Sequence, residues 1–394
     1  MASQLSAATP GMLLAALRRE GGLTRQDLLA STGMARSTLY GRLDQLQSAG
    51  LIYESGTRAP TGGRPATVVA FDDRDRVVLT IDIGHHRATV SLCELNGQAL
   101  TEEVVPRTPN EAIPALVERL GGLGERALER AGGVRLLGVG LAIPAPVNTH
   151  TGKRLVSIAL PDSDYPLVER LQERFGVHVA VENDARALTL GAAQEVPPMD
   201  DDGVLLGVKF STGLGIGLIT GGHIMRGSTG AAGDLGHLQI TPGEGPVCTC
   251  GRRGCLAAYV TGRALVRDLA RPGIATVGDV TAAYDAGDAE VVGLVHAAAR
   301  LLGTHLGGFV QVSNPQYVVF GGFLGGRDAI AREVAAAIQT QVSPRISDMA
   351  EYRIVSGDHV TASGLVALVL DQALAPEAVD ALVAASASNG SSTI

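Results

Sequence analysis

The feature that most constrains this fold is a cysteine-rich stretch, Gly233–Leu256, which reads GDLGHLQITPGEGPVCTCGRRGCL. It contains three of the chain's four cysteines, with a histidine a short way upstream: His237, Cys248, Cys250 and Cys255. Three thiolates and an imidazole form a tetrahedral set that suits Zn²⁺ better than hard cations. Glycines in the spacer allow tight turns that bring all four side chains onto one ion. We therefore expect a structural zinc site here.

Two other interpretations of the same cysteines are reduced thiols in a loop, or a single disulfide. Cys248 and Cys250 are separated by one residue, which is too close for a comfortable bridge. An intracellular chain also rarely keeps a disulfide. The donor types and their clustering favour zinc.

The composition indicates a large, mostly acidic protein. A chain of 394 residues is too long for one ordinary domain, so two or three are expected. Its hydrophobic content of 45% supports a large core, and no run reads as a membrane span. The apolar run Met12–Leu17 is short and has no basic residue before it, so we expect no secretory signal and a cytoplasmic protein.

Charge is unevenly distributed along the chain. The whole protein carries a net charge of −8, which argues against nucleic-acid binding by the chain as a whole. Residues 1–65, however, hold seven Arg, no Lys and four acids, so their net charge is 7 − 4 = +3. This pattern predicts a small basic module ahead of an acidic body.

The basic module shows three short helical patterns in succession, which we predict over Pro10–Arg19, Arg25–Ser31 and Ser37–Ala49. Thr24 is a good N-cap for the second helix, and Ser37 or Thr38 for the third. A glycine turn between the second and third helices is typical of a helix-turn-helix.

The third helix has an apolar face formed by Leu39, Leu43 and Leu46, which we expect to pack inward. The residues left to face a DNA major groove are then Arg36, Ser37, Thr38, Tyr40 and Arg42. Two extended pieces follow, around a tip rich in Gly, Pro and Arg, and they predict a wing. Arg58 and Arg64 of this wing would contact phosphates or the minor groove. The alternative is a small protein-interaction module with a solvated basic face.

From Val77 the pattern changes to strands and helices in alternation, which predicts an α/β body. Strands are expected over Val77–Ile83 and Ala88–Leu95, and long helices over Asp288–Val312 and Arg327–Ile346. The segment from Ser386 is small and polar and is expected to be disordered.

The pattern GxxGxAGDLGH followed by CxCGxxGCL resembles the signature of the ROK family, which groups bacterial sugar kinases with transcriptional repressors. The resemblance implies a winged helix-turn-helix over residues 1–70, and it extends to Gly63-Arg64-Pro65 of the wing. It also implies a two-lobed, actin-like (ribonuclease H-like) body over residues 76–394. Lobe 1 would span about 76–190 plus the C-terminal helix, and lobe 2 about 200–360 with the zinc loop.

The resemblance also assigns residues to a ligand. Asn183 and Asp184 would contact a sugar, with Asp184 as the base in a kinase, and His237 would both ligate zinc and reach the sugar. Asp234 stands where the family usually has a sugar-binding Glu, and two further polar contacts are replaced by Ala159 and Ala257. On residue type alone, Asp184 would more often be a helix cap.

A departure from the family concerns the first phosphate loop, Asp-x-Gly-Gly-Thr in the kinases. Here the loop reads Asp82-Ile83-Gly84-His85-His86, and the imidazoles are too bulky for close approach of a phosphate to the backbone. We therefore predict a DNA-binding regulator, a repressor of carbohydrate-related genes that acts as a homodimer or dimer of dimers. It would sense a sugar or sugar derivative and bind a double-stranded operator. The alternative is an ATP-dependent sugar kinase.

Overall fold

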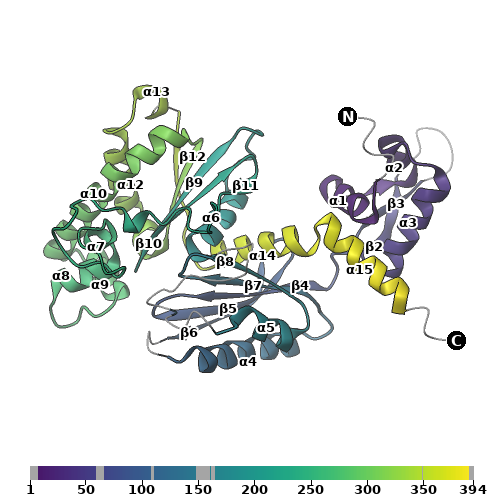
Figure 1. Ribbon diagram of the computed structural model, residues 1–394, viewed down its shortest axis with the longest axis horizontal. Coiled ribbons are helices and arrows are strands. Elements are labelled where there is room, and N and C mark those ends of the chain that lie inside the picture. Colours follow the sequence, from purple (N-terminus) through teal and green to yellow (C-terminus); the bar gives the residue numbers. More distant parts are fainter. Residues whose placement is uncertain are drawn as a thin grey trace. The chain divides into compact units, whose positions relative to one another are not determined.

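The computed structural model describes residues 8–58, 66–107, 111–147, 160, 165–347 and 349–389 (Figure 1). The chain forms two compact units, residues 1–76 together with 369–394, and residues 77–368. No helix within the described ranges is long and apolar enough to cross a membrane.

The first unit contains the predicted winged helix-turn-helix. Its helices are α1 (Pro10–Glu20), α2 (Arg25–Thr32) and α3 (Arg36–Ser48). Its antiparallel sheet has the order β1-β3-β2, formed by Leu23–Thr24, Ala66–Phe71 and Ile52–Arg58. The three leucines of α3 are buried, as the sequence pattern predicted.

The N-termini of α2 and α3 are capped differently. Thr24 caps α2 through a reciprocal capping box with Asp27, as expected for Thr at this position. The predicted caps of α3 are wrong, because that helix begins at Arg36 behind Ala35, which makes no side-chain cap. The Leu39 amide already donates to the Ala35 carbonyl, so Ser37 and Thr38 lie within the first turn, with exposed side chains.

A C-terminal helix, α15 (Pro376–Asn389), packs against α1 in the same unit. The Gly11 amide donates to Asp380 Oδ1 at 2.8 Å, and a Cβ on Gly11 would meet the Pro376 carbonyl oxygen at 2.1 Å. The disorder predicted from Ser386 is therefore wrong as far as Asn389, where the helix that packs against α1 ends. Residues 390–394 lie outside the described ranges.

The second unit contains two five-stranded sheets. The first has the order β6-β5-β4-β7-β8, in which β4, β5 and β6 form antiparallel hairpins and β7 and β8 run parallel. Helices α4 (Ile113–Ala131) and α5 (Leu167–Phe175) cover one face of it (Figure 1). The strands are Arg76–Ile83, Arg87–Glu94, Ala99–Pro106, Arg135–Ile143 and His178–Asn183. We call this sheet with its two helices the first lobe.

The second sheet repeats this arrangement in the order β11-β10-β9-β12-β13. Its strands are Val204–Phe210 (β9), Leu214–Thr220 (β10), His223–Ile224 (β11), Tyr317–Gly321 (β12) and Glu351–Ile354 (β13). Helices α10 (Ala289–Ser313) and α12 (Asp328–Gln339) share its apolar core. Three short helices and α11 complete the second lobe: α7 (Ala257–Val260), α8 (Gly262–Leu269), α9 (Val277–Asp285) and α11 (Gly322–Gly325).

Two helices pack on the other face of the second sheet, α6 (Asp184–Glu195) and α14 (His359–Ala373). They cross closely at two glycines: a Cβ on Gly191 would lie 1.7 Å from the Val360 carbonyl oxygen, and one on Gly364 would lie 2.0 Å from that of Ala187. Leu365 of α14 also lies against Gly140 of β7, so α14 contacts both sheets.

One long predicted helix is interrupted. The sequence pattern predicted a single helix over Arg327–Ile346, but α12 ends at Gln339 and a short helix, α13, begins at Pro344. Proline has no amide hydrogen to continue the ladder, so it starts a helix here instead of extending one.

Candidate metal centre, ligand cleft and DNA-binding face

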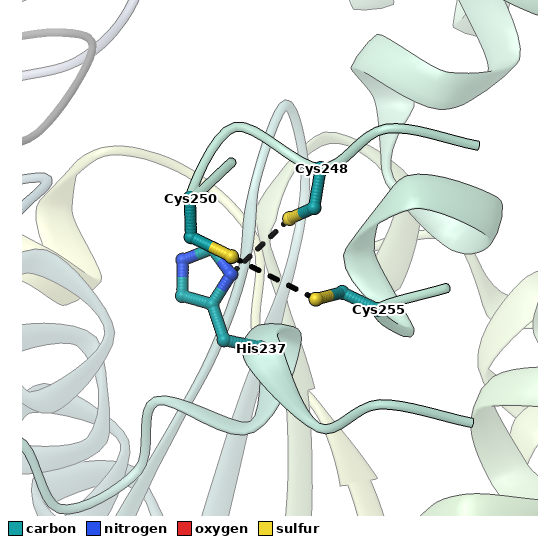
Figure 2. Close-up of side chains that lie close together, drawn as sticks. All are labelled: His237, Cys248, Cys250 and Cys255. Carbon is teal, nitrogen blue, oxygen red and sulfur yellow. Dashed lines mark hydrogen bonds between the residues drawn. The ribbon is translucent and has the colours of Figure 1, made fainter. Parts of the chain in front are cut away.

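The four predicted zinc ligands converge in the second lobe (Figure 2). One donor atom from each of His237, Cys248, Cys250 and Cys255 lies within 4.8 Å of all the others. The His237 Nδ1 atom is 3.2 Å from Cys248 Sγ, and Cys250 Sγ is 3.7 Å from Cys255 Sγ. Two sulfurs bound about 2.3 Å from one tetrahedral ion lie about 3.8 Å apart. This donor set and spacing can hold a metal ion.

Main-chain hydrogen bonds shape the loop that carries the cysteines. The Cys248 amide donates to the Arg252 carbonyl at 2.7 Å, and the Gly251 amide donates to the Cys248 carbonyl at 2.9 Å. A short helical turn, Leu235–His237, presents the histidine from the other side. The ligands therefore come from two small turns that are close in sequence.

The thiols differ in acidity. Burial acts to raise the pKa of Cys250, but hydrogen bonds from Arg252 outweigh burial and lower that pKa to about 6. Burial and the neighbouring thiols raise the pKa of Cys255 to about 12. A bound cation would favour the thiolate form of both groups.

A cleft of about 1300 Å³ lies in the second unit and is bordered by both lobes. Four residues that sequence reasoning assigned to a ligand line it together: Asn183, Asp184, Asp234 and His237. Ala257, one of the two departures from the family's polar contacts, also lines the cleft. Ala159, the other, lies outside the described residues.

Asn183 and Asp184 stand at the junction of β8 and α6. The Asn183 side chain caps α6 by accepting from the amides of Ala185 and Arg186. Asp184 Oδ2 accepts from Lys209 Nζ at 2.9 Å, and its Oδ1 accepts from the side-chain Nδ2 of Asn183 at 3.2 Å. Burial acts to lower the pKa of Lys209, but Asp184 and neighbouring carboxylates outweigh burial and raise that pKa. The carboxylate of Asp184 is thus already paired with a cation.

His237 connects the metal-ligand cluster to the cleft. Its Nδ1 faces the Cys248 sulfur, while its Nε2 lies 3.9 Å from Asp234 Oδ1 on the cleft side. The two nitrogens of one imidazole can therefore serve a metal and a cleft ligand at the same time.

The first turn, Gly84-His85-His86 between β4 and β5, also lines the cleft. Burial and the nearby Arg263 guanidinium lower the pKa of His85 to about 4, so its imidazole is neutral at neutral pH. Burial raises the pKa of Asp82 at the end of β4, and the buried Asp82 Oδ1 has no hydrogen-bond partner among the described residues.

The exposed face of α3 carries the residues predicted to contact DNA. Arg36, Ser37 and Thr38 are exposed, while Tyr40 and Arg42 are half-buried. Two guanidinium groups lie close to the Tyr40 ring, with the Arg25 Cζ 5.4 Å and the Arg36 Cζ 5.5 Å from its centroid. Arg36 and Tyr40 thus form one cationic, aromatic surface at the start of the helix.

The wing is described only at its base. Strands β2 and β3 pair from Ile52 opposite Phe71 to Arg58 opposite Ala66, which places Arg58 at the end of β2. Arg64 lies outside the described residues. The two strands nevertheless form the hairpin that the sequence predicted next to α3.

Sequence reasoning did not identify Lys209 or Arg263 as cleft residues. Both lie next to the second turn, Ser211-Thr212-Gly213, the first at the end of β9 and the second in the first turn of α8. The sequence did contain one indication of Lys209, which interrupts an otherwise apolar strand. A lysine is seldom buried without a charged partner, so such a residue predicts a nearby carboxylate.

Comparisons with known proteins cover both units. A match to the ROK family spans residues 78–372, and a match to the winged helix-turn-helix DNA-binding family spans residues 9–53. The chain is 24% identical to the xylose repressor of Bacillus spizizenii over 92% of this chain and 95% of that protein. It is 26% identical to the glucokinase of Halalkalibacterium halodurans over 72% of this chain and 91% of the kinase.

Among solved structures, the chain is similar to a ROK family transcriptional regulator described as a homolog of the Escherichia coli MLC protein. The match has a TM-score of 0.75 at 23% identity and covers 95% of this chain and 98% of the regulator. A likeness at this identity supports the fold, from the winged module through the two-lobed body.

Proposed function

The chain belongs to the ROK family, and from this we propose that it is a DNA-binding transcriptional regulator that represses carbohydrate-related genes. Its body would sense a sugar or sugar derivative in the cleft. The observation that carries this proposal is the N-terminal winged helix-turn-helix, which a kinase does not need. The xylose repressor aligns with 92% of this chain, whereas the glucokinase aligns with 72%.

The cleft supports binding of a ligand more than phosphoryl transfer. A kinase base must accept a proton, but Asp184 is held in an ion pair with Lys209. The first turn presents His85 and His86 where a phosphate would need to approach the backbone. Asn183, Asp184, Asp234 and His237 would then hydrogen-bond the hydroxyls of a sugar without reacting with it.

Zinc is the metal that best suits the cluster of His237, Cys248, Cys250 and Cys255. The ion would cross-link two turns of the second lobe and fix the imidazole that faces the cleft. In this role it supplies structure, and the side chains around it contact the ligand.

We further propose a winged domain over residues 1–70 and a ligand-sensing body over 76–394, working as a homodimer or a dimer of dimers in the cytoplasm. Two winged modules related by a two-fold axis would bind a pseudo-palindromic operator. A ligand that changes the separation of the two modules would alter DNA affinity, and DNA would alter ligand affinity by the same factor.

Gel-shift titrations with DNA from the protein's own gene neighbourhood test this proposal. Arg36→Ala should weaken specific binding by about 1–3 kcal/mol and relax sequence preference, because Arg36 would contact base edges. Arg64→Ala should weaken binding to all sequences if the side chain contacts only phosphate. Arg19→Ala is a matched control, since this exposed arginine of α1 lies outside the predicted contact surface.

If a chain lacking residues 1–70 bound the operator as well as the full chain, the DNA-binding assignment would be wrong. The rival function has its own test, a coupled kinase assay over hexoses and amino sugars. Robust turnover that Asp184→Asn abolishes would establish the kinase instead.

A further inference from the structure

One carboxylate of the second unit is fully buried and is bound by two arginines. The side chain of Glu182, near the end of β8, has no exposed surface. Its Oε1 accepts from Arg186 Nε at 2.6 Å, and its Oε2 accepts from Arg226 Nε at 2.8 Å. The Asn183 amide also donates to Oε1, at 2.8 Å. Because a buried carboxylate needs such partners, Glu182 holds both guanidinium groups in fixed positions.

Arg186 connects this network to the main chain of a loop. Its side chain is only 1% exposed, and its Nη1 donates to the carbonyls of Gly230 and Ala232 at 2.8 and 3.1 Å. Arg226 stands at the start of the same loop, where its carbonyl accepts from the Ala232 amide at 3.1 Å. The two arginines therefore hold both ends of the loop Arg226–Ala232.

This loop leads directly into residues that we assign to the ligand. Ala231, Ala232 and Asp234 line the cleft, and His237 follows in the next short helical turn. The Asp234 amide donates to the Ala231 carbonyl at 3.3 Å. The position of the Asp234 carboxylate thus depends on the conformation of the loop before it.

Arg186 is also close to the other ligand residues. It lies in the first turn of α6, two residues after Asp184, and its amide donates to the Asn183 side chain at 3.2 Å. One side chain therefore joins two groups of predicted ligand residues, Asn183 with Asp184 and Asp234 with His237. Holding such groups in place before binding lowers the entropy cost of binding.

Stability alone does not require an arginine at this position. Replacing a buried ion pair by well-packed apolar side chains is often neutral or even stabilising. An apolar side chain could not, however, provide the hydrogen bonds to the Gly230 and Ala232 carbonyls that orient the loop. The particular contribution of Arg186 is therefore the placement of main chain beside the cleft.

We propose that Arg186 is a positioning residue of the ligand cleft, which fixes the loop Arg226–Ala232 and with it Asp234. The two groups of ligand residues are then held in one arrangement before a ligand binds. This inference rests on the proposed function, because it concerns how the effector site of the regulator is preorganised.

Hydrogen exchange tests the placement of the loop without any ligand. In Arg186→Met the amides of residues 227–237 should exchange about tenfold faster relative to those of β9, because two hydrogen bonds to the loop are lost. Exchange in β9 reports unfolding of the whole lobe, so this ratio separates loosening of the loop from general destabilisation.

Two further variants make that result specific. Arg186→Lys should restore part of the protection, since it keeps a charge beside Glu182 but has one donor nitrogen in place of three. Val334→Ala is the matched control, because this buried side chain of α12 lies in the core of the second lobe, and its loss destabilises the lobe through a cavity. It should leave the ratio unchanged. If Arg186→Met does not fold, the exchange of Arg186→Lys is compared with the wild type instead.

Isothermal titration of the full chain with xylose, glucose and N-acetylglucosamine tests the consequence for binding. Any of these sugars that the wild type binds should bind about tenfold or more weakly to Arg186→Met, at a temperature where the variant is folded. Its affinity for Val334→Ala should equal the wild-type value, and Arg186→Lys should recover part of the loss.

Unchanged exchange of the loop in Arg186→Met relative to β9 would overturn the proposal, and this result decides it if none of the three sugars binds. Equal losses of sugar affinity in Arg186→Met and Val334→Ala would also overturn it, because the network would then serve stability alone.

Gel shifts with operator DNA distinguish this failure from failure of the proposed function. If a sugar releases the operator equally well from the wild type and Arg186→Met, the protein is a regulator and the positioning role is wrong. If Arg186→Met loosens the loop and weakens sugar binding but the full chain binds no operator, the DNA-binding function is wrong and the positioning role stands.

Discussion

The two lobes of the second unit are built alike but differ where their first hairpins turn toward the cleft. Each sheet has three antiparallel strands followed by two parallel ones, and each first hairpin has a three-residue turn, Gly84–His86 or Ser211–Gly213. In the first turn the side chains are imidazoles, whereas the second has small hydroxyls and a glycine. A repeated fold thus provides two equivalent positions, and the side chains at each decide its chemistry.

Different parts of the molecule hold the two turns in place. Arg107 binds the first turn, donating from its amide to the His86 carbonyl at 2.9 Å and from Nη1 to the Gly84 carbonyl at 2.7 Å. The start of α8 binds the second turn through the amides of Gly262 and Arg263. One lobe thus holds its turn with a side chain, and the other holds its turn with a helix terminus.

The largest expected difference between the lobes is their dependence on metal. Cys250→Ser should remove zinc and disorder the second lobe, because structural zinc contributes on the order of 10 kcal/mol in small peptides. The first lobe should keep its core. Elemental analysis and thermal melting measure the effect, and Cys93→Ala, a buried first-lobe cysteine outside the cluster, should keep its zinc. Protein purified without chelator that contains no zinc would contradict this prediction.

A buried ion pair that links the lobes should have the next largest effect. Glu182, at the end of β8, accepts from Arg186 Nε at 2.6 Å, and both side chains are almost fully buried. Arg186 also donates to the carbonyls of Gly230 and Ala232 in the second lobe. Arg186→Met should cost about 3 kcal/mol in unfolding free energy, the lower end of the range for a broken buried pair. Glu182 loses one buried partner but keeps Arg226, whose Nε donates to Glu182 Oε2 at 2.8 Å.

Chemical denaturation measures that cost. The control is Arg174→Met, which breaks ion pairs with the largely solvent-exposed side chains of Glu118 and Glu125 on the first lobe, worth about 0–1 kcal/mol. Equal losses in the two variants would mean that Arg186 is not the link between the lobes.

The turn between β4 and β5 should make stability depend on pH. The pKa of His85 is about 4 in the folded protein, lowered first by burial and then by Arg263, against about 6.5 when unfolded. Between these values the unfolded chain binds more protons, so stability should fall as pH drops from about 6.5 to about 4. The loss attributable to His85 is at most about 3 kcal/mol.

His85→Gln is the variant that isolates this effect. Its stability should fall less over the same range, since the other groups facing His85 (Asp184, His86, Lys209 and Arg263) remain. Parallel slopes for the variant and the wild type, measured by urea denaturation at several pH values, would rule out His85 as the source.

The features that the sequence predicted correctly are mostly local. The four metal ligands fall within nineteen residues and are joined by glycine turns, so their convergence follows from composition and spacing. Thr24 caps the helix expected of it for the same reason. The single long helix predicted over Arg327–Ile346 failed because one proline outweighed a helical pattern.

The features that sequence reasoning missed depend on contacts between distant segments. Lys209 and Asp184 are brought together by the packing of α6 against β9, and Arg263 meets His85 only when both lobes border one cleft. No periodicity or spacing encodes such pairs. The packing of α15 on α1 was missed for the same reason, since the two helices lie at opposite ends of the chain.

The smallest expected effect compares the two turns directly. An alanine Cβ at Gly84 would lie 2.9 Å from the Arg87 carbonyl oxygen, the atom that accepts the Gly84 amide at 2.9 Å. Backbone must therefore shift, and Gly84→Ala should cost about 1–3 kcal/mol. At Gly213 the nearest atom to a new Cβ is His85 Nε2, at an ordinary contact distance of 3.9 Å. Gly213→Ala should thus change stability by less than about 0.5 kcal/mol.

Denaturation of the two alanine variants side by side measures this difference. Neither glycine has a left-handed backbone, so the steric contact of the added methyl group is the quantity being compared. A larger loss at Gly213 than at Gly84 would show that the second turn is the more tightly packed one. The small side chains there would then serve packing, and the room they leave in the cleft could not be assigned to a ligand.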